Sequence, residues 1–223
     1  MKNGISLGGG ALWVLIWVGF MFFYTLLDVA VWKKICPAGE KYLNLLSVAA
    51  CTAAFLILLA RKNQFRVDLF GSITLRGILL AAGCAVLFYL LLDKGLDPVL
   101  ERLFPASEAD YRQALRSLGE APAISFLRIC VLAPVTEEIL MRGFLLGGLS
   151  VRYGSAAALL VSALLFALLH FNMVQTLSAF VCGIFLGLLY LHTGSLFCCV
   201  LAHSGYNLIA CMTAIFPLGR RPL

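Results

Sequence analysis

The sequence has few charged residues and no extended polar region. Only 13% of its 223 residues are charged and 62% are hydrophobic, whereas an ordinary soluble domain is about a quarter charged. The longest polar stretch, residues 93–120, is shorter than the roughly 50 residues of a small soluble domain. These deficits exclude a large soluble domain. The long apolar runs that remain predict an all-α, polytopic transmembrane helical bundle.

Several catalytic and metal-binding motifs are also missing. The sequence contains no HExxH zinc motif and no GxSG serine motif, and no predicted span carries a paired-aspartate arrangement. The eight cysteines form no CxxC pair and fall mostly inside apolar runs. We therefore interpret them as small buried hydrophobic side chains.

The positive net charge does not indicate a nucleic-acid partner. The formal net charge is +6, but the Lys and Arg residues lie mainly between apolar runs. There, the positive-inside bias and anionic lipid headgroups account for them. The first apolar run is too long for a signal peptide and has no small-residue cleavage site. We therefore predict the bilayer as partner, no nucleic acid and no cleaved leader.

Seven apolar runs predict membrane-spanning helices, because about 20 residues of helix cross a bilayer. They are Ala11–Trp32, Tyr42–Ala60, Ile73–Leu92, Ile124–Leu149, Ser155–His170, Val174–His192 and Leu196–Pro217. The last four are joined by few residues, which predicts antiparallel neighbours. We expect residues 1–223 to form one integral membrane domain, with N-terminal spans in 1–92, a surface segment in 93–120 and a helical core in 121–217.

The polar segment 93–120 predicts one or two short amphipathic helices on the membrane surface. Asp97-Pro98 is typical of a helix start. Ser107-Glu108-Ala109-Asp110 resembles a capping box, followed by apolar residues at helical spacing and by Gly119. This segment leads directly into the next span. It is therefore either part of a substrate entrance or a plain surface linker.

The run from Ile124 to Leu149 contains charges that need an explanation. An Asp, Lys or Arg near the centre of a membrane helix costs roughly 2.5–3.5 kcal/mol, and a Glu should cost something comparable. Glu138 and Arg142 are four residues apart with the acid first, so we expect a buried ion pair that positions the helix. Glu137 lies about 100° around the helix without such a partner. An unpaired intramembrane carboxylate suggests a functional site, and Pro134 predicts a kink just before it.

Two later spans carry the other unusual polar residues. Their depths can be estimated by placing Arg128 at one membrane boundary and letting antiparallel helices rise 1.5 Å per residue. Measured from that boundary, Glu137 and Asn207 lie roughly 14 Å deep, His170 roughly 8 Å and His203 roughly 20 Å. Buried histidines are more often structural than catalytic. Here, however, the four side chains fall near a common level. We therefore expect them to meet in the membrane interior.

The chemistry that suits these four residues is hydrolysis by an activated water. Glu137 can take a proton from water, with His170 as the partner that helps to hold it. His203 and Asn207 lie four residues apart on one helix face and can donate hydrogen bonds to a developing oxyanion. No other nucleophile is evident, which favours hydrolysis over group transfer.

Three blocks of the sequence resemble a known family. The blocks are Glu137-Glu138-xxx-Arg142, Phe166-xxx-His170 and His203-xxx-Asn207. They resemble, in the same order, the three motifs of the CAAX-protease and bacteriocin-processing (CPBP, or Abi) intramembrane proteases. The resemblance covers roughly Ala121 to Pro217. It implies an endopeptidase acting on membrane-associated proteins or peptides, with Glu137 as base, His170 assisting it, and His203 and Asn207 as the oxyanion site.

The resemblance also implies about eight membrane helices, so the expected number of spans is seven to eight. It leaves the cofactor open, because members of the family have been described as metalloproteases and Glu137, His170 and His203 are possible zinc ligands. We favour metal-free catalysis, since no partner for each histidine is evident.

The alternative is a non-enzymatic membrane protein, such as a transporter or an immunity or chaperone factor. Transporters also keep acids and histidines at the midplane, often with internal repeats. No convincing repeat relates the two halves of this sequence, and every motif residue is present. We therefore expect an active enzyme, located in a bacterial cytoplasmic membrane.

Overall fold

The computed structural model describes residues 4–107, 109, 113 and 119–215, and among these it contains helices and no strands. The predicted all-α class is confirmed. The first long helix is α1 (Leu7–Leu27), which continues through the π-helical stretch η1 (Asp28–Trp32) and α2 (Lys33–Ile35). The second is α3 (Glu40–Asn63). The third is α4 (Leu75–Phe88), which continues through η2 (Tyr89–Leu96) and α5 (Asp97–Leu103).

The C-terminal part begins with another composite helix. It consists of α7 (Pro122–Phe126), η3 (Leu127–Leu132), α8 (Ala133–Glu138), η4 (Ile139–Leu146) and α9 (Gly147–Tyr153). Three further helices follow after short connections, and they are α10 (Ser155–Leu168), α11 (Met173–Thr193) and α12 (Leu196–Ile215). The predicted helical order is thus found, and most helices extend beyond their apolar runs.

Five helices within the described residues are long and apolar enough to cross a membrane. They are Leu7–Ile35, Glu40–Asn63, Leu75–Leu103, Met173–Thr193 and Leu196–Thr213. Of the other predicted spans, Pro122–Tyr153 carries the buried charges and α10 has only 14 residues. The number of seven to eight spans is therefore not confirmed, although the chain is an integral membrane protein.

The helix start expected at Asp97-Pro98 is wrong. The helix that begins at Leu75 runs through these residues to Leu103, because the backbone takes π-helical register before the proline. The Asp97 N–H bonds to the Leu92 carbonyl, five residues back, and the helix continues through Pro98 although a proline has no N–H to give. Of the expected capping box, Glu108 and Asp110 lie outside the described residues.

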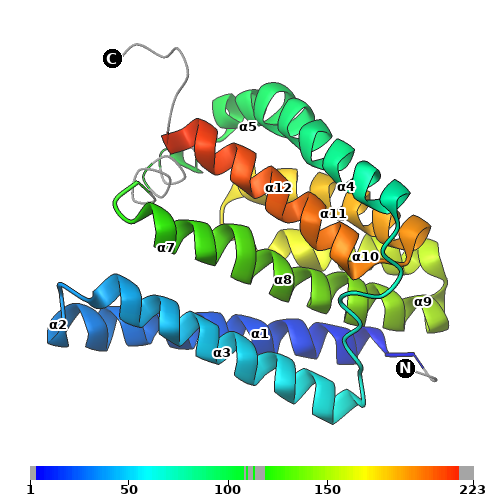
Figure 1. The fold of residues 1–223 in the computed structure, drawn as a ribbon, viewed down its shortest axis with the longest axis horizontal. Coiled ribbons are helices and arrows are strands. Elements are labelled where there is room, and N and C mark those ends of the chain that lie inside the picture. Colours follow the sequence, from blue (N-terminus) through cyan, green and yellow to red (C-terminus); the bar gives the residue numbers. More distant parts are fainter. Residues whose placement is uncertain (1–3, 108, 110–112, 114–118, 216–223) are drawn as a thin grey trace.

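Figure 1 shows how the helices are arranged. Helices α1 and α3 lie side by side, and the composite helix α7–α9 lies between this pair and the rest of the bundle. Helix α12 packs against α4, and α10 packs against α11. The main core lies between these groups, where Trp13 and Trp17 of α1 contact Phe55 of α3 at ring-centroid distances of 6.2 and 4.8 Å.

Small residues bring α10 and α11 close together. A Cβ added to Gly183 would lie 3.1 Å from the Ala163 Cβ, and one added to Gly187 would lie 2.3 Å from a methyl carbon of Leu159. The Gly183-xxx-Gly187 spacing therefore allows the two helices to approach. This contact matters for the site because α10 leads into His170.

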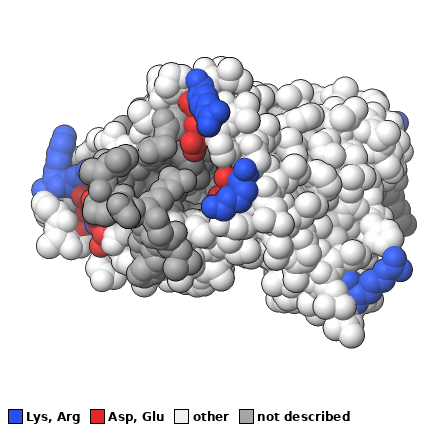
Figure 2. Space-filling view, turned by 90° about the horizontal axis from the view of Figure 1, so that it is seen from above, with Lys and Arg blue, Asp and Glu red and all other residues white. Residues whose placement is uncertain are grey.

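The outer surface is suited to lipid. Large apolar side chains stand outward, among them Leu15, Phe22 and Leu75, which are 66%, 63% and 73% exposed. Figure 2 shows a face on which charged side chains are few and separated by wide uncharged areas. At the start of α3, Lys41 donates a 2.8 Å hydrogen bond to Glu120, and this bond lowers the pKa of the exposed Glu120 carboxyl.

Candidate active site

The two adjacent glutamates lie in a short α-helical segment between two π-helical stretches. Helix α8 carries Glu137 and Glu138, with η3 before it and η4 after it. Single π-helical turns often occur at functional sites because they shift the register of the following side chains. The helix continues through Pro134, which occupies the first turn of α8 and has no N–H to donate.

Glu138 lies at the centre of a fully buried charged group. One of its oxygens lies 3.1 Å from the Arg142 Nε, and the other lies 2.9 Å from the His203 Nδ1. The side chains of Glu138 and Arg142 are 0% and 1% exposed. The ion pair expected from the spacing is present, and Glu138 also holds His203 on α12.

Arg142 makes two further contacts that fix its position. Its Nη2 donates to the Gly183 carbonyl at 3.3 Å, and its guanidinium lies 4.6 Å from the centroid of the Phe166 ring. Arg142 can reach the Gly183 carbonyl because α11 packs closely against its neighbours at this glycine. Arg142 thus connects the composite helix to α10 and α11.

Glu137 points into a cavity, and Glu138 does not. The Glu137 side chain remains 17% exposed, and its Oε2 lies 3.9 Å from the His203 Nε2. Within the described residues, no Lys or Arg lies within ion-pair distance of Glu137. The two neighbouring acids therefore have different surroundings, and Glu137 is the one that can meet a water molecule.

The hydrogen bond to Glu138 determines how His203 can act. A carboxylate can only accept, so the His203 Nδ1 carries the hydrogen and donates it to Glu138. The His203 Nε2 then faces Glu137 across 3.9 Å. This nitrogen can donate to a further group only when the ring is doubly protonated.

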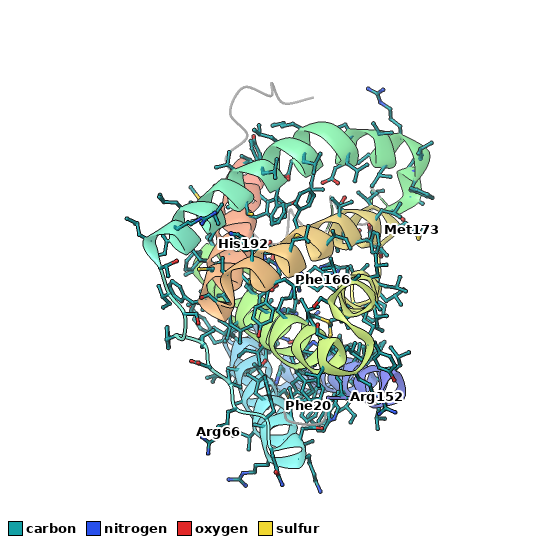
Figure 3. The ribbon with its side chains drawn as sticks, turned by 90° about the vertical axis from the view of Figure 1, so that its right-hand side faces the viewer. Phe20, Arg66, Arg152, Phe166, Met173 and His192 are labelled. Carbon is teal, nitrogen blue, oxygen red and sulfur yellow. The ribbon has the colours of Figure 1, made fainter. Side chains whose placement is uncertain are left out.

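His170 lies just beyond the end of α10. Its Nδ1 donates to the Phe166 carbonyl at 3.1 Å, so a neutral ring leaves Nε2 as an acceptor. The carbonyl of His170 accepts from Thr176 and from the Asn172 N–H. The Phe166 ring packs at edge-to-face angles against both histidines, 5.1 Å from His170 and 5.8 Å from His203. Figure 3 shows Phe166 inside the bundle.

Asn207 is on the same helix as His203 and is held by the backbone of η3. Its Nδ2 donates to the Ile129 carbonyl at 2.9 Å. The other amide hydrogen and the Oδ1 remain for the cavity that Asn207 lines.

One cavity of about 380 Å³ brings the four side chains together. Glu137, His170, His203 and Asn207 all line it, which is the convergence that the depth argument predicted. His170 makes no direct hydrogen bond or ion pair with Glu137. The expectation that a water joins these two residues therefore stays a prediction. The rest of the wall is largely apolar and includes Trp17, Met21, Val48, Leu92, Val174 and Ala179.

Comparison with known proteins identifies this part of the chain. Residues 119–209 match the family described as type II CAAX prenyl endopeptidase, Rce1-like. This segment is therefore similar to CAAX-type peptidases. The family is a peptidase family, and the matched residues include Glu137, His170, His203 and Asn207. Neither the curated proteins nor the solved structures contain a match to the chain.

Sequence reasoning missed several side chains in the wall of this cavity. Tyr24, Arg128, Thr136, Asp97 and Ser178 also line it. Asp97 accepts from Ser178, and Asp93 of the same helix accepts from Tyr206. The third long helix therefore carries two aspartates four residues apart, each bonded to a hydroxyl group. Their spacing was visible, but the predicted span ended at Leu92.

The described residues of the site do not present a set of converging metal ligands. Among the described residues, no group of three or more His, Cys, Asp or Glu side chains is placed to hold an ion. The His170 Nδ1 bonds to a carbonyl and the His203 Nδ1 bonds to Glu138. Each histidine thus has a partner of the kind that zinc-ligating histidines have, with its Nε2 left free, which corrects the expectation that no such partner exists. Only the lack of three converging ligands among the described residues speaks against zinc at Glu137, His170 and His203, and metal-free catalysis stays a prediction.

Proposed function

We propose that this protein is an intramembrane endopeptidase that hydrolyses peptide bonds of membrane-associated proteins or peptides with a water activated by Glu137. The observation that carries the proposal is the single cavity lined by Glu137, His170, His203 and Asn207. The match to the CAAX protease family supports the reaction class. We also propose that the protein lies in a bacterial cytoplasmic membrane.

In the proposed reaction, Glu137 first acts as a general base. Its carboxylate takes a proton from a water in the cavity, and the oxygen of that water attacks the carbonyl carbon of the scissile bond. The His170 Nε2 accepts the second hydrogen of the same water and so orients it. Glu137 then passes its proton to the amine that leaves. The second proton stays on the new carboxyl group, so the products are a carboxylic acid and an amine, and no covalent enzyme intermediate forms.

The developing oxyanion is stabilised from α12. The His203 Nε2 and the unused Asn207 N–H are the donors, and such bonds are strong where water is excluded. His203 donates as an imidazolium, since Glu138 already accepts from its Nδ1. With that charge, Glu137, Glu138, Arg142 and His203 sum to zero. A neutral sum favours the buried group, because an uncompensated charge in a membrane interior is costly.

The cavity also suggests how a peptide lies in the site. Its wall follows one face of the composite helix, and the residues of that face are Arg128, Ile129, Leu132, Ala133, Thr136 and Glu137. From Arg128 to Glu137 the helix rises nine steps of 1.5 Å, or about 13 Å, which is the length of about four residues of extended peptide. Arg128 at the exposed end is held by Asn44 at 3.2 Å and lies 5.9 Å from the Tyr24 ring. We propose that the peptide runs from Glu137 towards this cation.

Arg128→Gln is therefore expected to weaken the binding of substrates that carry a negative charge at that end. A partly exposed ion pair contributes up to about 1 kcal/mol, so we expect KM to rise up to about fivefold while kcat changes little. The measurement compares two versions of one peptide, with a free and with an amidated C-terminus. The difference between them should be smaller in the variant. An equal difference in both proteins would remove Arg128 from substrate binding.

The proposed function is tested with purified protein in lipid vesicles. Peptides of defined sequence, with and without a lipid anchor, are incubated with the protein, and the products are identified by mass spectrometry. We expect cleavage at an internal bond that is absent with empty vesicles. If no peptide in a diverse set is cut while a solute crosses the vesicle membrane, the transporter alternative holds instead.

A further inference from the structure

A proline in the composite helix leaves a backbone carbonyl free at the position where Asn207 binds. At the end of η3 the Ala133 N–H bonds to the Arg128 carbonyl, five residues back. The next pair in this register is residue 134 with the Ile129 carbonyl. Residue 134 is a proline and has no N–H. The Ile129 carbonyl instead accepts from the Asn207 Nδ2 at 2.9 Å.

We infer that Pro134 is a positioning residue, which holds Asn207 in the cavity by withholding a backbone donor from Ile129. A buried carbonyl without a partner is costly, so it will bind the nearest available donor. Here that donor is a side chain from α12, one turn after His203. The role of Asn207 in catalysis rests on the proposed function, whereas the coupling between Pro134 and Asn207 does not.

The bond to Ile129 sets the orientation of the Asn207 amide as well as the distance between α12 and η3. A carbonyl can only accept, so the amide nitrogen of Asn207 is directed to Ile129 and its orientation is set. The second N–H is then held in the cavity wall shared with Glu137 and His203. A residue with its own N–H at position 134 would compete for the Ile129 carbonyl, and Asn207 would be free to turn.

Pro98 provides an internal control, because it also follows directly after a π-helical hydrogen bond but takes no part in the contact between Ile129 and Asn207. It also follows a π-helical stretch, and the Asp97 N–H before it bonds to the Leu92 carbonyl, five residues back. Pro98→Ala therefore restores a backbone donor after a π-helical stretch but leaves Ile129 and Asn207 untouched.

A double-mutant cycle on thermal stability tests the coupling directly. Asn207→Ala in the wild-type protein leaves the Ile129 carbonyl without its donor and should lower Tm by several degrees. In the Pro134→Ala background the new N–H can replace that donor, so the same change should lower Tm by less than half as much. In the Pro98→Ala background its full effect should remain. Asn207→Leu, which keeps the side-chain volume, should behave in the same way.

Activity provides the second readout, with the same variants. Removing an oxyanion donor lowers kcat by about 10²–10³-fold, and we expect Asn207→Ala to do so. Pro134→Ala should lower kcat about tenfold with KM near the wild-type value, because Asn207 is present but no longer held. Pro98→Ala should retain the wild-type kcat.

The outcomes separate this inference from the proposed function. If Asn207→Ala lowers Tm equally in the wild-type and Pro134→Ala backgrounds, Pro134 does not act through Asn207 and the inference is wrong, whether or not the protein cleaves peptides. If the Tm effects are coupled but no peptide is cleaved by any variant, the positioning holds and the proposed function fails.

Discussion

Replacing Glu137 with Gln should lower peptide cleavage by about 10²–10⁴-fold, the usual contribution of a general base. Gln has nearly the same size and can still bind a water, but it cannot take a proton at neutral pH. The side chain points into the cavity and takes part in no ion pair with Lys or Arg among the described residues. The variant should therefore fold and insert, and its Tm should fall less than that of a variant at the fully buried Glu138. The measurement is kcat on purified protein in vesicles, together with Tm.

Glu138→Gln is the matched control for this prediction, because it changes the neighbouring carboxylate in the same way. Glu138 is fully buried between Arg142 and His203, so its loss should lower Tm as well as activity. The account is contradicted if Glu137→Gln retains more than a tenth of wild-type cleavage. A large drop in its Tm would show that Glu137 has a structural role.

Replacing Arg142 with Ala should be the most destabilising single change in the site. It removes the cation that pairs with Glu138 at 3.1 Å and leaves a buried charge uncompensated. Breaking a buried ion pair in this way costs about 3–5 kcal/mol. The contacts with the Gly183 carbonyl and the Phe166 ring are lost as well. We expect low abundance in the membrane and a clearly lower Tm, measured by fluorescence size exclusion over a temperature series.

A double variant separates the stability effect from the effect on His203. Arg142→Leu combined with Glu138→Leu removes both charges together and should recover much of the lost Tm, because apolar replacement of a buried pair is often neutral. Cleavage should stay low, since His203 has lost the acceptor that orients it. Wild-type abundance and Tm in Arg142→Ala would show that the pair does not stabilise the protein.

The sequence was sufficient for the helical class and for four polar side chains that line the cavity, because both depend on local patterns. Apolar runs of membrane length predicted the helices, and the costs of intramembrane charge drew attention to Glu137, Glu138 and Arg142. The i,i+4 spacing predicted the Glu138–Arg142 pair, which the structure contains at 3.1 Å. Helix rise and antiparallel order were enough to place His170, His203 and Asn207 near Glu137.

The contacts between helices could not be predicted in the same way, because they depend on rotation and register. The bond between Glu138 and His203 joins residues 65 positions apart, and helix depth alone does not say which of two adjacent acids faces α12. The bond between Asn207 and Ile129 depends on the π-helical register of η3. No pattern in the sequence predicted these π-helical stretches. One of them, η2, carries the third long helix through Asp97 and so makes it longer than expected.

The site explains why two adjacent glutamates differ in role. Glu138 is buried, paired with Arg142 and bonded to His203, so it orients other groups. Glu137 is partly exposed to the cavity and lies 3.9 Å from the same imidazole ring. The family match to residues 119–209 agrees with a peptidase. The substrate and the activated water remain proposals that the variants above test.

The most direct test of the central claim compares peptide termini in membranes that contain equal amounts of the wild-type protein or the Glu137→Gln variant. Quantitative mass spectrometry of protein termini identifies bonds that are cut only when Glu137 is present. We predict a small set of membrane-associated proteins or peptides with new termini in the wild-type sample alone. The same termini at the same abundance in both samples would contradict the assignment of Glu137 as the base that activates water.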